Sequence, residues 1–207
     1  PCLPYNKMLF FTLFAMTDTR RASIILGITG GVAAYKAAEL ARLWVKAGYA
    51  VQAVMTEAAT HFVGTATLQA LTGRPVLTEL WGSAGSGMDH IHASRQADLI
   101  VVAPASADFM AKLAQGRADD LLSTLCLARA CPLMLAPAMN REMWGNPATQ
   151  RNLAQLIEDG VHIVGPDSGE QACGETGLGR MSAPQAIFDA VKAMLSNGLL
   201  AGKKVLI

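Results

Sequence analysis

The stretch Ser23-Ile24-Ile25-Leu26-Gly27-Ile28-Thr29-Gly30-Gly31 decides the fold class of this chain of 207 residues. Its first six residues are apolar at almost every position, which predicts a strand buried on both faces, as the central strands of parallel sheets are. The last three residues predict a tight turn, and residues 32–47 carry apolar side chains at helical spacing. Gly48 follows at the position where helices commonly end. The stretch therefore predicts a strand that leads into a helix, the repeating unit of an α/β sheet.

The remainder of the chain repeats this alternation. Strands that alternate with helices predict a doubly wound parallel sheet of the Rossmann or flavodoxin-like type, with helices on both faces. The glycine-rich range 165–180 is expected to be irregular. We expect further strands at 50–55, 98–103, 132–136 and 161–164, helices at 64–72, 119–130, 146–160 and 184–195, and a loop with a helix at 104–116.

Three segments follow from this pattern. We expect residues 1–20 to be a tail without a role in the fold, and residues 21–196 to form one α/β domain. Ser196-Asn197-Gly198 predicts a break after the last helix. We interpret residues 197–207 as a linker and the first strand of a further domain, which this sequence does not include.

The composition argues against several classes of function. Hydrophobic residues make up 52% of the chain and charged residues 16%, which is typical of a compact domain with a buried sheet. The net charge of +1 gives no electrostatic reason to expect nucleic acid or an anionic membrane surface as a partner. The apolar run 9–16 is too short to span a bilayer. The four cysteines form no C-x-x-C pair and no zinc-ligand spacing, so we expect no metal and a reducing, cytoplasmic setting.

An amide side chain follows one of the predicted strands. Pro137-Ala138-Met139-Asn140 comes directly after the apolar run 132–136, so Asn140 should lie at the carboxyl end of a buried strand. Ligands bind at that edge of open α/β sheets. A buried amide needs hydrogen-bond partners, and a ligand carboxylate or amide could supply one. The alternative is that Asn140 only caps a helix or a turn.

The first turn has the features of a phosphate site. Backbone N–H groups at a helix N-terminus bind anions, and Gly30 and Gly31 let an anion approach closely. The pattern is not G-x-G-x-x-G, so a mononucleotide fits better than a dinucleotide. Thr56, at the end of the second predicted strand, could donate its hydroxyl to the same phosphate. The alternatives are a plain tight turn at the glycines and a helix cap at Thr56.

Small residues follow the next predicted strand. The side chains of Ala103-Pro104-Ala105-Ser106-Ala107-Asp108 leave space above the sheet edge, as a flat ring would require. Close packing of a helix on the sheet would explain the same residues. The segment is therefore compatible with a planar ligand without requiring one.

Two further side chains could take part in proton transfer. His90, in Met88-Asp89-His90-Ile91-His92, could act as a general base near neutral pH, although a single histidine is more often structural or solvated. Cys173 lies in Gln171-Ala172-Cys173-Gly174, and a thiol in a glycine-flanked loop could work from a lid that closes over a site. An incidental loop thiol is the alternative.

Taken together, five segments resemble the homo-oligomeric flavin-containing cysteine decarboxylases. They occur in that family's order over nearly all of residues 22–195. Pro-Ala-Met-Asn and the cysteine loop are the specific segments, whereas the glycine turn alone would be weak. The five segments are 27–36, 88–92, 103–108, 137–140 and 165–181.

The resemblance implies an enzyme that uses FMN to decarboxylate 4'-phosphopantothenoylcysteine to 4'-phosphopantetheine in coenzyme A biosynthesis. FMN would oxidise the cysteine thiol to a thioaldehyde, which provides the electron sink that loss of carbon dioxide needs, and would then return the electrons. The resemblance further implies FMN at the subunit interfaces of a trimer, with trimers often assembled into a dodecamer. Residues 21–196 would be the FMN-binding decarboxylase domain, and residues 203–207 resemble the start of a synthetase domain that is missing.

The resemblance also implies roles for individual residues. His90 would be the catalytic base, and Cys173 would supply a proton from the lid. Asn140 and Met143 would hold the carboxylate and amide region of the substrate. Some members of the family have Asn where this chain has Asp108. The implied flavin contacts are Thr29, Gly30, Gly31, Thr56, Ser106, Asp108, Ala138 and Met139.

Two other interpretations remain open. The same fold serves peptidyl-cysteine decarboxylases and flavin prenyltransferases, and the synthetase-like residues 203–207 argue against both. The other alternative is a non-catalytic FMN-binding subunit that regulates a phosphatase. Such relatives typically carry long charged tails, which this sequence lacks.

Overall fold

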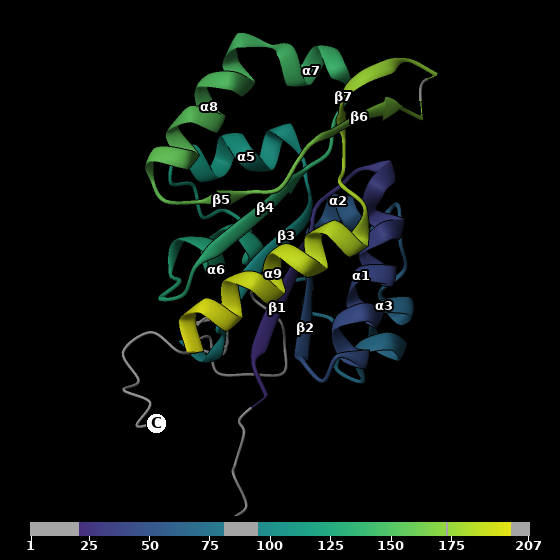
Figure 1. Cartoon of the computed structure of the whole chain (residues 1–207), viewed down its shortest axis with the longest axis vertical. Helices are drawn as coiled ribbons and strands as arrows, with labels where there is room; N and C mark the ends of the chain where they lie inside the picture. The colour runs from purple at the N-terminus through teal and green to yellow at the C-terminus, as the bar shows by residue number, and fades with distance from the viewer. Residues whose placement is uncertain (1–20, 81–94, 173, 200–207) are drawn as a thin grey trace, which may run out of the picture.

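The computed structural model describes residues 21–80, 95–172 and 174–199, which contain a five-stranded parallel sheet between two layers of helices (Figure 1). The strand order is β2-β1-β3-β4-β5, a doubly wound order in which the winding reverses between β1 and β3. All four strand pairs of this sheet are parallel. The predicted fold class is therefore confirmed. The strands are β1 Ser23–Ile28, β2 Ala50–Met55, β3 Leu99–Ala105, β4 Leu133–Pro137 and β5 His162–Ile163.

Helices cover both faces of the sheet and enclose two hydrophobic cores. Helices α1, α3 and α9 pack on one face, and α5, α6 and α8 on the other. Along β3, Leu99 and Val101 enter the first core, while Ile100 and Val102 enter the second. Both faces are buried, which explains why the strand sequences show no alternation of polar side chains. The helices are η1 Val32–Ala34, α1 Tyr35–Lys46, α2 Glu57–Thr60, α3 Thr65–Thr72, α5 Ala107–Ala114, α6 Leu121–Leu127, α7 Arg141–Gly145, α8 Pro147–Glu158 and α9 Pro184–Leu199.

The carboxyl ends of β1 and β3 are held together by the side chain of Thr29. Its hydroxyl donates to the carbonyl of Pro104 at 2.8 Å and accepts from the backbone N–H of Ser106 at 2.9 Å. Only 2% of Thr29 is exposed to solvent. These bonds satisfy buried polar groups and fix the spacing of the two strand ends. We refer to them as the Thr29 latch.

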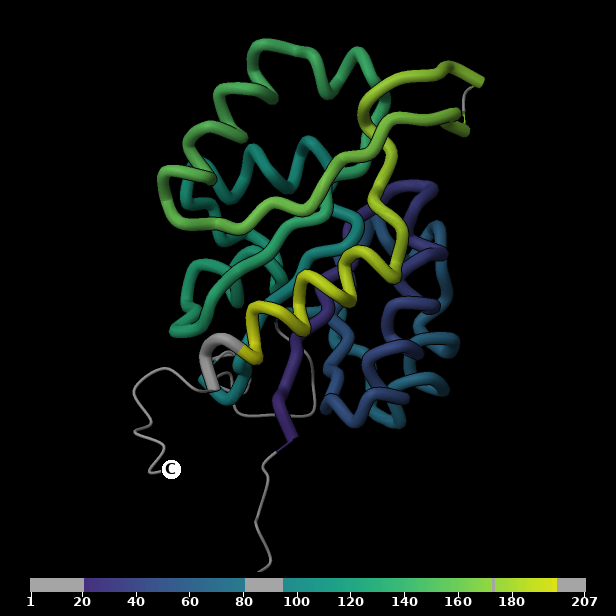
Figure 2. The backbone as a smooth tube through the Cα atoms, in the orientation of Figure 1, coloured from purple at the N-terminus to yellow at the C-terminus, as the bar shows by residue number. Residues whose placement is uncertain are grey.

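A glycine-rich hairpin occupies the range that the sequence led us to expect to be irregular. Strands β6 Asp167–Glu170 and β7 Thr176–Arg180 pair antiparallel, and in Figure 2 this hairpin projects from the body of the molecule. The prediction was wrong because neither strand has an apolar alternation for a sequence pattern to reveal. The hairpin is instead anchored by the chain after β4, where the backbone N–H of Met139 donates to the carbonyl of Gly179 at 2.9 Å.

Two helix boundaries also differ from expectation. Helix α9 runs through Leu199, so the break predicted at 196–198 is absent. The hydroxyl of Ser196 donates to the carbonyl of Lys192 at 2.6 Å within the helix, and α9 packs its apolar side chains into the first core. Helix α6 is shorter than the predicted 119–130, because Asp120 forms a capping box with Ser123 that fixes its start.

Candidate functional site

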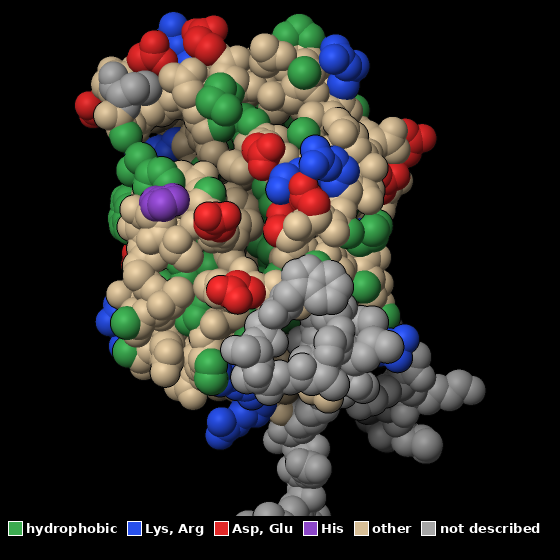
Figure 3. All heavy atoms as spheres, turned by 180° about the vertical axis from the view of Figure 1, so that it is seen from behind, with side chains coloured by type: hydrophobic (Ala, Val, Ile, Leu, Met, Phe, Trp, Pro, Cys, Tyr) green, Lys and Arg blue, Asp and Glu red, His purple; other side chains and the backbone are tan. Residues whose placement is uncertain are grey.

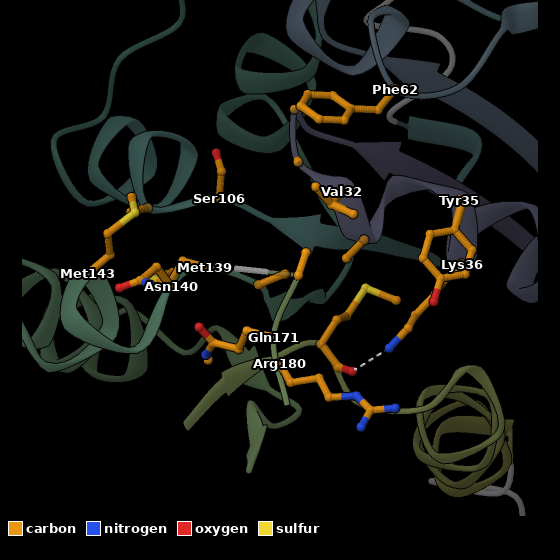
Figure 4. Close-up of a pocket in the computed structure, with 18 of the residues that line it drawn as sticks. Val32, Tyr35, Lys36, Phe62, Ser106, Met139, Asn140, Met143, Gln171 and Arg180 are labelled. Carbon is orange, nitrogen blue, oxygen red and sulfur yellow. Dashed lines mark hydrogen bonds between the residues drawn. The ribbon is translucent and has the colours of Figure 1, made fainter. Parts of the chain in front are cut away.

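A cavity of about 750 Å³ lies at the carboxyl ends of β1, β3 and β4. Its walls come from five places: the first turn and the start of α1, Phe62 between α2 and α3, the start of α5, the segment from Ala138 to Met143, and the hairpin with the residue that follows it. Figure 4 shows the side chains of Asn140 and Met143 on one side of this cavity and those of Lys36 and Arg180 on another. The location is the reversal point between β1 and β3, where open α/β sheets bind ligands.

The two glycines of the first turn have different surroundings. A Cβ on Gly30 would lie 2.6 Å from the Cβ of Ala58 and 3.1 Å from the backbone carbonyl carbon of that residue, so packing within the protein requires glycine there. A Cβ on Gly31 would have no atom within 4 Å, and the φ angle of 167° is extended backbone that any residue adopts. Gly31 lines the cavity, so the missing side chain leaves space for a ligand.

The segment after β3 places a hydroxyl, but not a carboxylate, on the cavity wall. Ser106 lines the cavity and also caps α5, since its Oγ accepts from the backbone N–H of Phe109 at 3.2 Å. Asp108 is exposed in the first turn of α5, outside the described residues that form the wall. Both flavin contacts stay predictions: Ser106 lies on the cavity wall where such a contact was expected, and Asp108 does not.

The two threonines expected to contact the flavin have other partners. Thr56 caps α2: its Oγ1 accepts from the backbone N–H of Ala59 at 3.3 Å and lies 3.4 Å from the carbonyl oxygen of Ile28, to which it donates. Thr29 is buried in the latch between β1 and β3. Neither belongs to the described residues that line the cavity. The alternative that Thr56 is a helix cap is therefore confirmed.

Asn140 caps a helix, as one interpretation of the sequence predicted, and it also lines the cavity in which the other interpretation expects a ligand. Its Oδ1 accepts from the backbone N–H of Glu142 at 2.8 Å, which caps α7. Its Nδ2 donates to the carboxylate of Glu175 at 2.7 Å, and Glu175 belongs to the hairpin, directly before β7. These two partners fix the orientation of the amide. Ala138 and Met139, which precede it, line the same cavity.

Of the three other predicted site residues, the structure describes Met143 but not His90 or Cys173. Met143 lines the cavity, and 48% of it is exposed. His90 and Cys173 lie outside the described residues. Ala172, which precedes Cys173, belongs to the cavity wall on the hairpin side.

The structure adds cavity residues that the sequence did not single out. Phe62, Val32 and Tyr35 bring large apolar surface to the rim, with 49%, 56% and 61% of each residue exposed. Lys36 and Arg180 bring positive charge. Burial lowers the pKa of the Lys36 ammonium, and the nearby charge of Arg180 lowers it further. The sequence could have indicated both cations as site residues, because Lys36 and Arg180 each lie in a segment that carried the family resemblance.

Outside the cavity we looked for a metal site, a membrane-spanning helix and a charged surface patch. Within the described ranges, no group of three or more His, Cys, Asp or Glu side chains is arranged to hold a metal ion. None of the described helices combines the length and apolar character needed to cross a membrane. On the face shown in Figure 3, Lys and Arg side chains form separate small groups, some of them beside Asp or Glu. Among the ion pairs of the described residues, the ammonium of Lys112 lies 3.0 Å from carboxylate oxygens of both Asp119 and Asp120.

A comparison against protein families identifies the family of this chain. The chain belongs to the Flavoprotein family, whose profile matches residues 15–196. The resemblance drawn from the sequence is thus confirmed at the level of the family.

Individual relatives narrow the comparison. The chain is 48% identical over 185 residues to the coenzyme A biosynthesis bifunctional protein CoaBC of Vibrio cholerae, covering 89% of this chain and 46% of that protein. It therefore spans about half the length of this curated relative. A solved mutant of PPC decarboxylase in complex with pantothenoylaminoethenethiol matches with a TM-score of 0.77 and 33% identity, over 86% of this chain and 100% of that one. The FMN binding protein AtHal3 matches with a TM-score of 0.72 and 34% identity, over 86% and 98% of the two chains.

Proposed function

We propose that this chain is an FMN-dependent decarboxylase that converts 4'-phosphopantothenoylcysteine to 4'-phosphopantetheine in coenzyme A biosynthesis. The observation that carries the proposal is the cavity at the reversal point of the sheet, whose walls include both the open Gly31 turn and the oriented amide of Asn140. Its volume of about 750 Å³ falls within the range of roughly 300–1,000 Å³ that small-molecule sites occupy. The relatives named for coenzyme A biosynthesis and for PPC decarboxylase support this assignment.

The cavity suits FMN on the residues present. A Cβ at Gly31 would fill open space, which an anion can use, and the backbone of Gly30 and Gly31 precedes η1. Ser106, Ala138 and Met139 provide small or apolar surface at the strand ends for a planar ring. When bound, FMN supplies a reversible two-electron oxidation of the substrate thiol, which makes loss of carbon dioxide feasible.

Asn140 is the side chain that we assign to the substrate carboxylate, with Met143 beside it. Because Glu142 and Glu175 already orient the amide, little conformational freedom is lost when a substrate binds. His90 as general base and Cys173 as proton donor from the hairpin complete the proposal.

The apolar rim supports a site completed by other copies of the chain. Val32, Tyr35 and Phe62 are exposed beside the cavity, where large apolar side chains are favoured at subunit contacts. A trimer, with a dodecamer as the larger assembly, is the oligomer that we propose. A synthetase domain in the same protein is part of the proposal, with residues 21–196 as the decarboxylase domain, because the curated relative is about twice as long as the matched region. We place the protein in the cytoplasm.

The function is tested with the FMN-loaded protein and 4'-phosphopantothenoylcysteine, by measuring carbon dioxide and 4'-phosphopantetheine. Asn140→Asp keeps an oxygen that can cap α7 but removes the N–H donor and places a second carboxylate beside Glu175, so we expect turnover to be lost while the fold is kept. Cys173→Ser should release carbon dioxide but accumulate an oxidised enethiol product. A yellow wild-type protein that releases no carbon dioxide would refute the proposal and favour a non-catalytic regulator.

A further inference from the structure

Two cations lie together on one wall of the cavity. Lys36 comes from the first turn of α1, and Arg180 ends β7. The ammonium of Lys36 donates to the backbone carbonyl of Met181 at 3.1 Å, which brings it beside the strand end that carries Arg180. Figure 4 shows both side chains on the opposite side of the cavity from Asn140 and Met143.

Glu170 is a carboxylate on the hairpin wall of the cavity, but it forms no ion pair with Lys36 or Arg180. Within the described ranges, neither cation has a carboxylate oxygen within 4.0 Å. Burial and the charge of Arg180 lower the pKa of Lys36, and the attraction of Asp167 and Glu39 offsets this only in part. The carboxylate of Asp167 already accepts a hydrogen bond from Ser182 at 2.8 Å. Two cations that repel each other beside a cavity are stabilised when an anion binds there.

The pair has the chemistry that recognises a phosphate monoester. A guanidinium can form two parallel hydrogen bonds with a phosphate, and an ammonium acts as a compact charge beside it. Gly169 leaves room for the guanidinium, because a Cβ there would lie 3.0 Å from Nη1 of Arg180. The hairpin therefore accommodates the Arg180 side chain against its neighbouring strand.

We propose that Lys36 and Arg180 bind the phosphate group of the substrate and thereby select it over its unphosphorylated counterpart. This inference rests on the proposed function, which supplies a substrate with a carboxylate at one end and a phosphate at the other. Asn140 and Met143 receive the carboxylate end, and the two cations lie across the cavity from them. The phosphate of FMN is also a monoester, but the open turn at Gly31 is assigned to it.

The test measures ligand preference as well as activity. Calorimetry on the FMN-loaded full chain gives Kd for 4'-phosphopantetheine and for pantetheine, which differ only in the phosphate. Lys36→Met and Arg180→Gln should each reduce the preference for the phosphorylated ligand about 10- to 100-fold, the effect expected for one charged hydrogen bond. Lys192→Met, which removes an exposed cation from α9, is the matched control and should keep the wild-type preference. Lys36→Arg should retain most of it.

A second measurement distinguishes the two phosphates. Titration of the apoprotein with FMN and with riboflavin reports on the flavin phosphate, and the ratio of the two Kd values should be the same in all variants. Loss of that ratio in Lys36→Met or Arg180→Gln would assign the pair to FMN and overturn the inference. If the wild type releases carbon dioxide but Lys36→Met and Arg180→Gln keep the wild-type preference for 4'-phosphopantetheine, the inference is overturned and the proposed function stands. A wild-type protein that neither releases carbon dioxide nor binds 4'-phosphopantetheine would refute the proposed function as well.

Discussion

Exchanging each of two adjacent glycines for alanine should give opposite results. Gly30→Ala places a Cβ 2.6 Å from the Cβ of Ala58, whereas carbon atoms in favourable contact lie about 3.5–4.0 Å apart. The α2 helix that carries Ala58 must therefore move by about 1 Å. Gly31→Ala meets no atom within 4 Å and requires no change of backbone conformation.

The magnitudes follow from these contacts. Overpacking of this kind costs roughly 1–3 kcal/mol, so Gly30→Ala should lower the free energy of unfolding by that amount. For a domain of this size, each kcal/mol lowers Tm by about 2–4 °C. Gly31→Ala should instead raise the free energy of unfolding by about 0.4–1 kcal/mol, because alanine restricts the unfolded chain and fits the folded one. The same methyl group occupies the space assigned to FMN, so FMN affinity should fall at least tenfold.

Urea unfolding of the two apoproteins and titration with FMN, followed by flavin fluorescence, measure both quantities. The decisive result is the separation of the two properties: Gly31→Ala should be a stable protein that binds FMN weakly. If Gly31→Ala binds FMN as tightly as the wild type, the flavin does not occupy the turn and the reasoning fails. If Gly30→Ala is as stable as the wild type, the contact with Ala58 does not constrain the turn.

Three further predictions concern side chains around the cavity and in the core. Glu175→Ala should lower kcat/KM about fivefold without changing FMN affinity, because a partly exposed hydrogen bond that orients Asn140 is lost, and Glu175→Gln should retain most of the activity. Lys36→Met should leave Tm of the ligand-free protein at pH 7 unchanged or higher, since the lowered pKa shows that the folded state disfavours this charge, a penalty that fades only as pH rises toward 10.5. Burial raises the pKa of Cys126 from 9.0 to about 12, so folding retains a proton that the unfolded chain loses, and the free energy of unfolding should fall above pH 9 by up to about 1.4 kcal/mol per pH unit. Urea unfolding of wild type and Cys126→Ala at pH 8.5 and 10.5 checks this, and equal pH slopes for the two proteins would contradict it.

The sequence allowed the sheet to be predicted because its signals are local. Strand β3 is apolar throughout, and the glycine turn and the Asn140 segment come directly after strands, so their place at one sheet edge followed from topology. The sequence also indicated the helix caps at Thr56 and Asn140, which the structure shows. Asn140 caps a helix and also lines the cavity, so the cap does not exclude the ligand contact, which stays a prediction.

Tertiary contacts explain what the sequence did not reveal. The hairpin has no apolar alternation, and its place depends on hydrogen bonds to Met139 and Arg141, far away in the chain. Lys36 and Arg180 are two of several cations, and their place on one wall depends on the folded structure, in which Lys36 bonds to the carbonyl of Met181, the residue next to Arg180. Thr29 was predicted as a ligand contact, whereas its hydroxyl is used within the fold to join two strand ends.

The hairpin also has a consequence for how relatives with this fold can differ in sequence. Its strands bury few side chains, and its connections to the body run through the short segment around Met139 and Arg141. New residues near Glu170, Gln171 and Ala172 would therefore leave both hydrophobic cores intact, while one wall of the cavity would change. We therefore expect that transplanting this hairpin between relatives changes the part of the ligand preference that depends on the hairpin wall, without requiring compensating changes in the sheet.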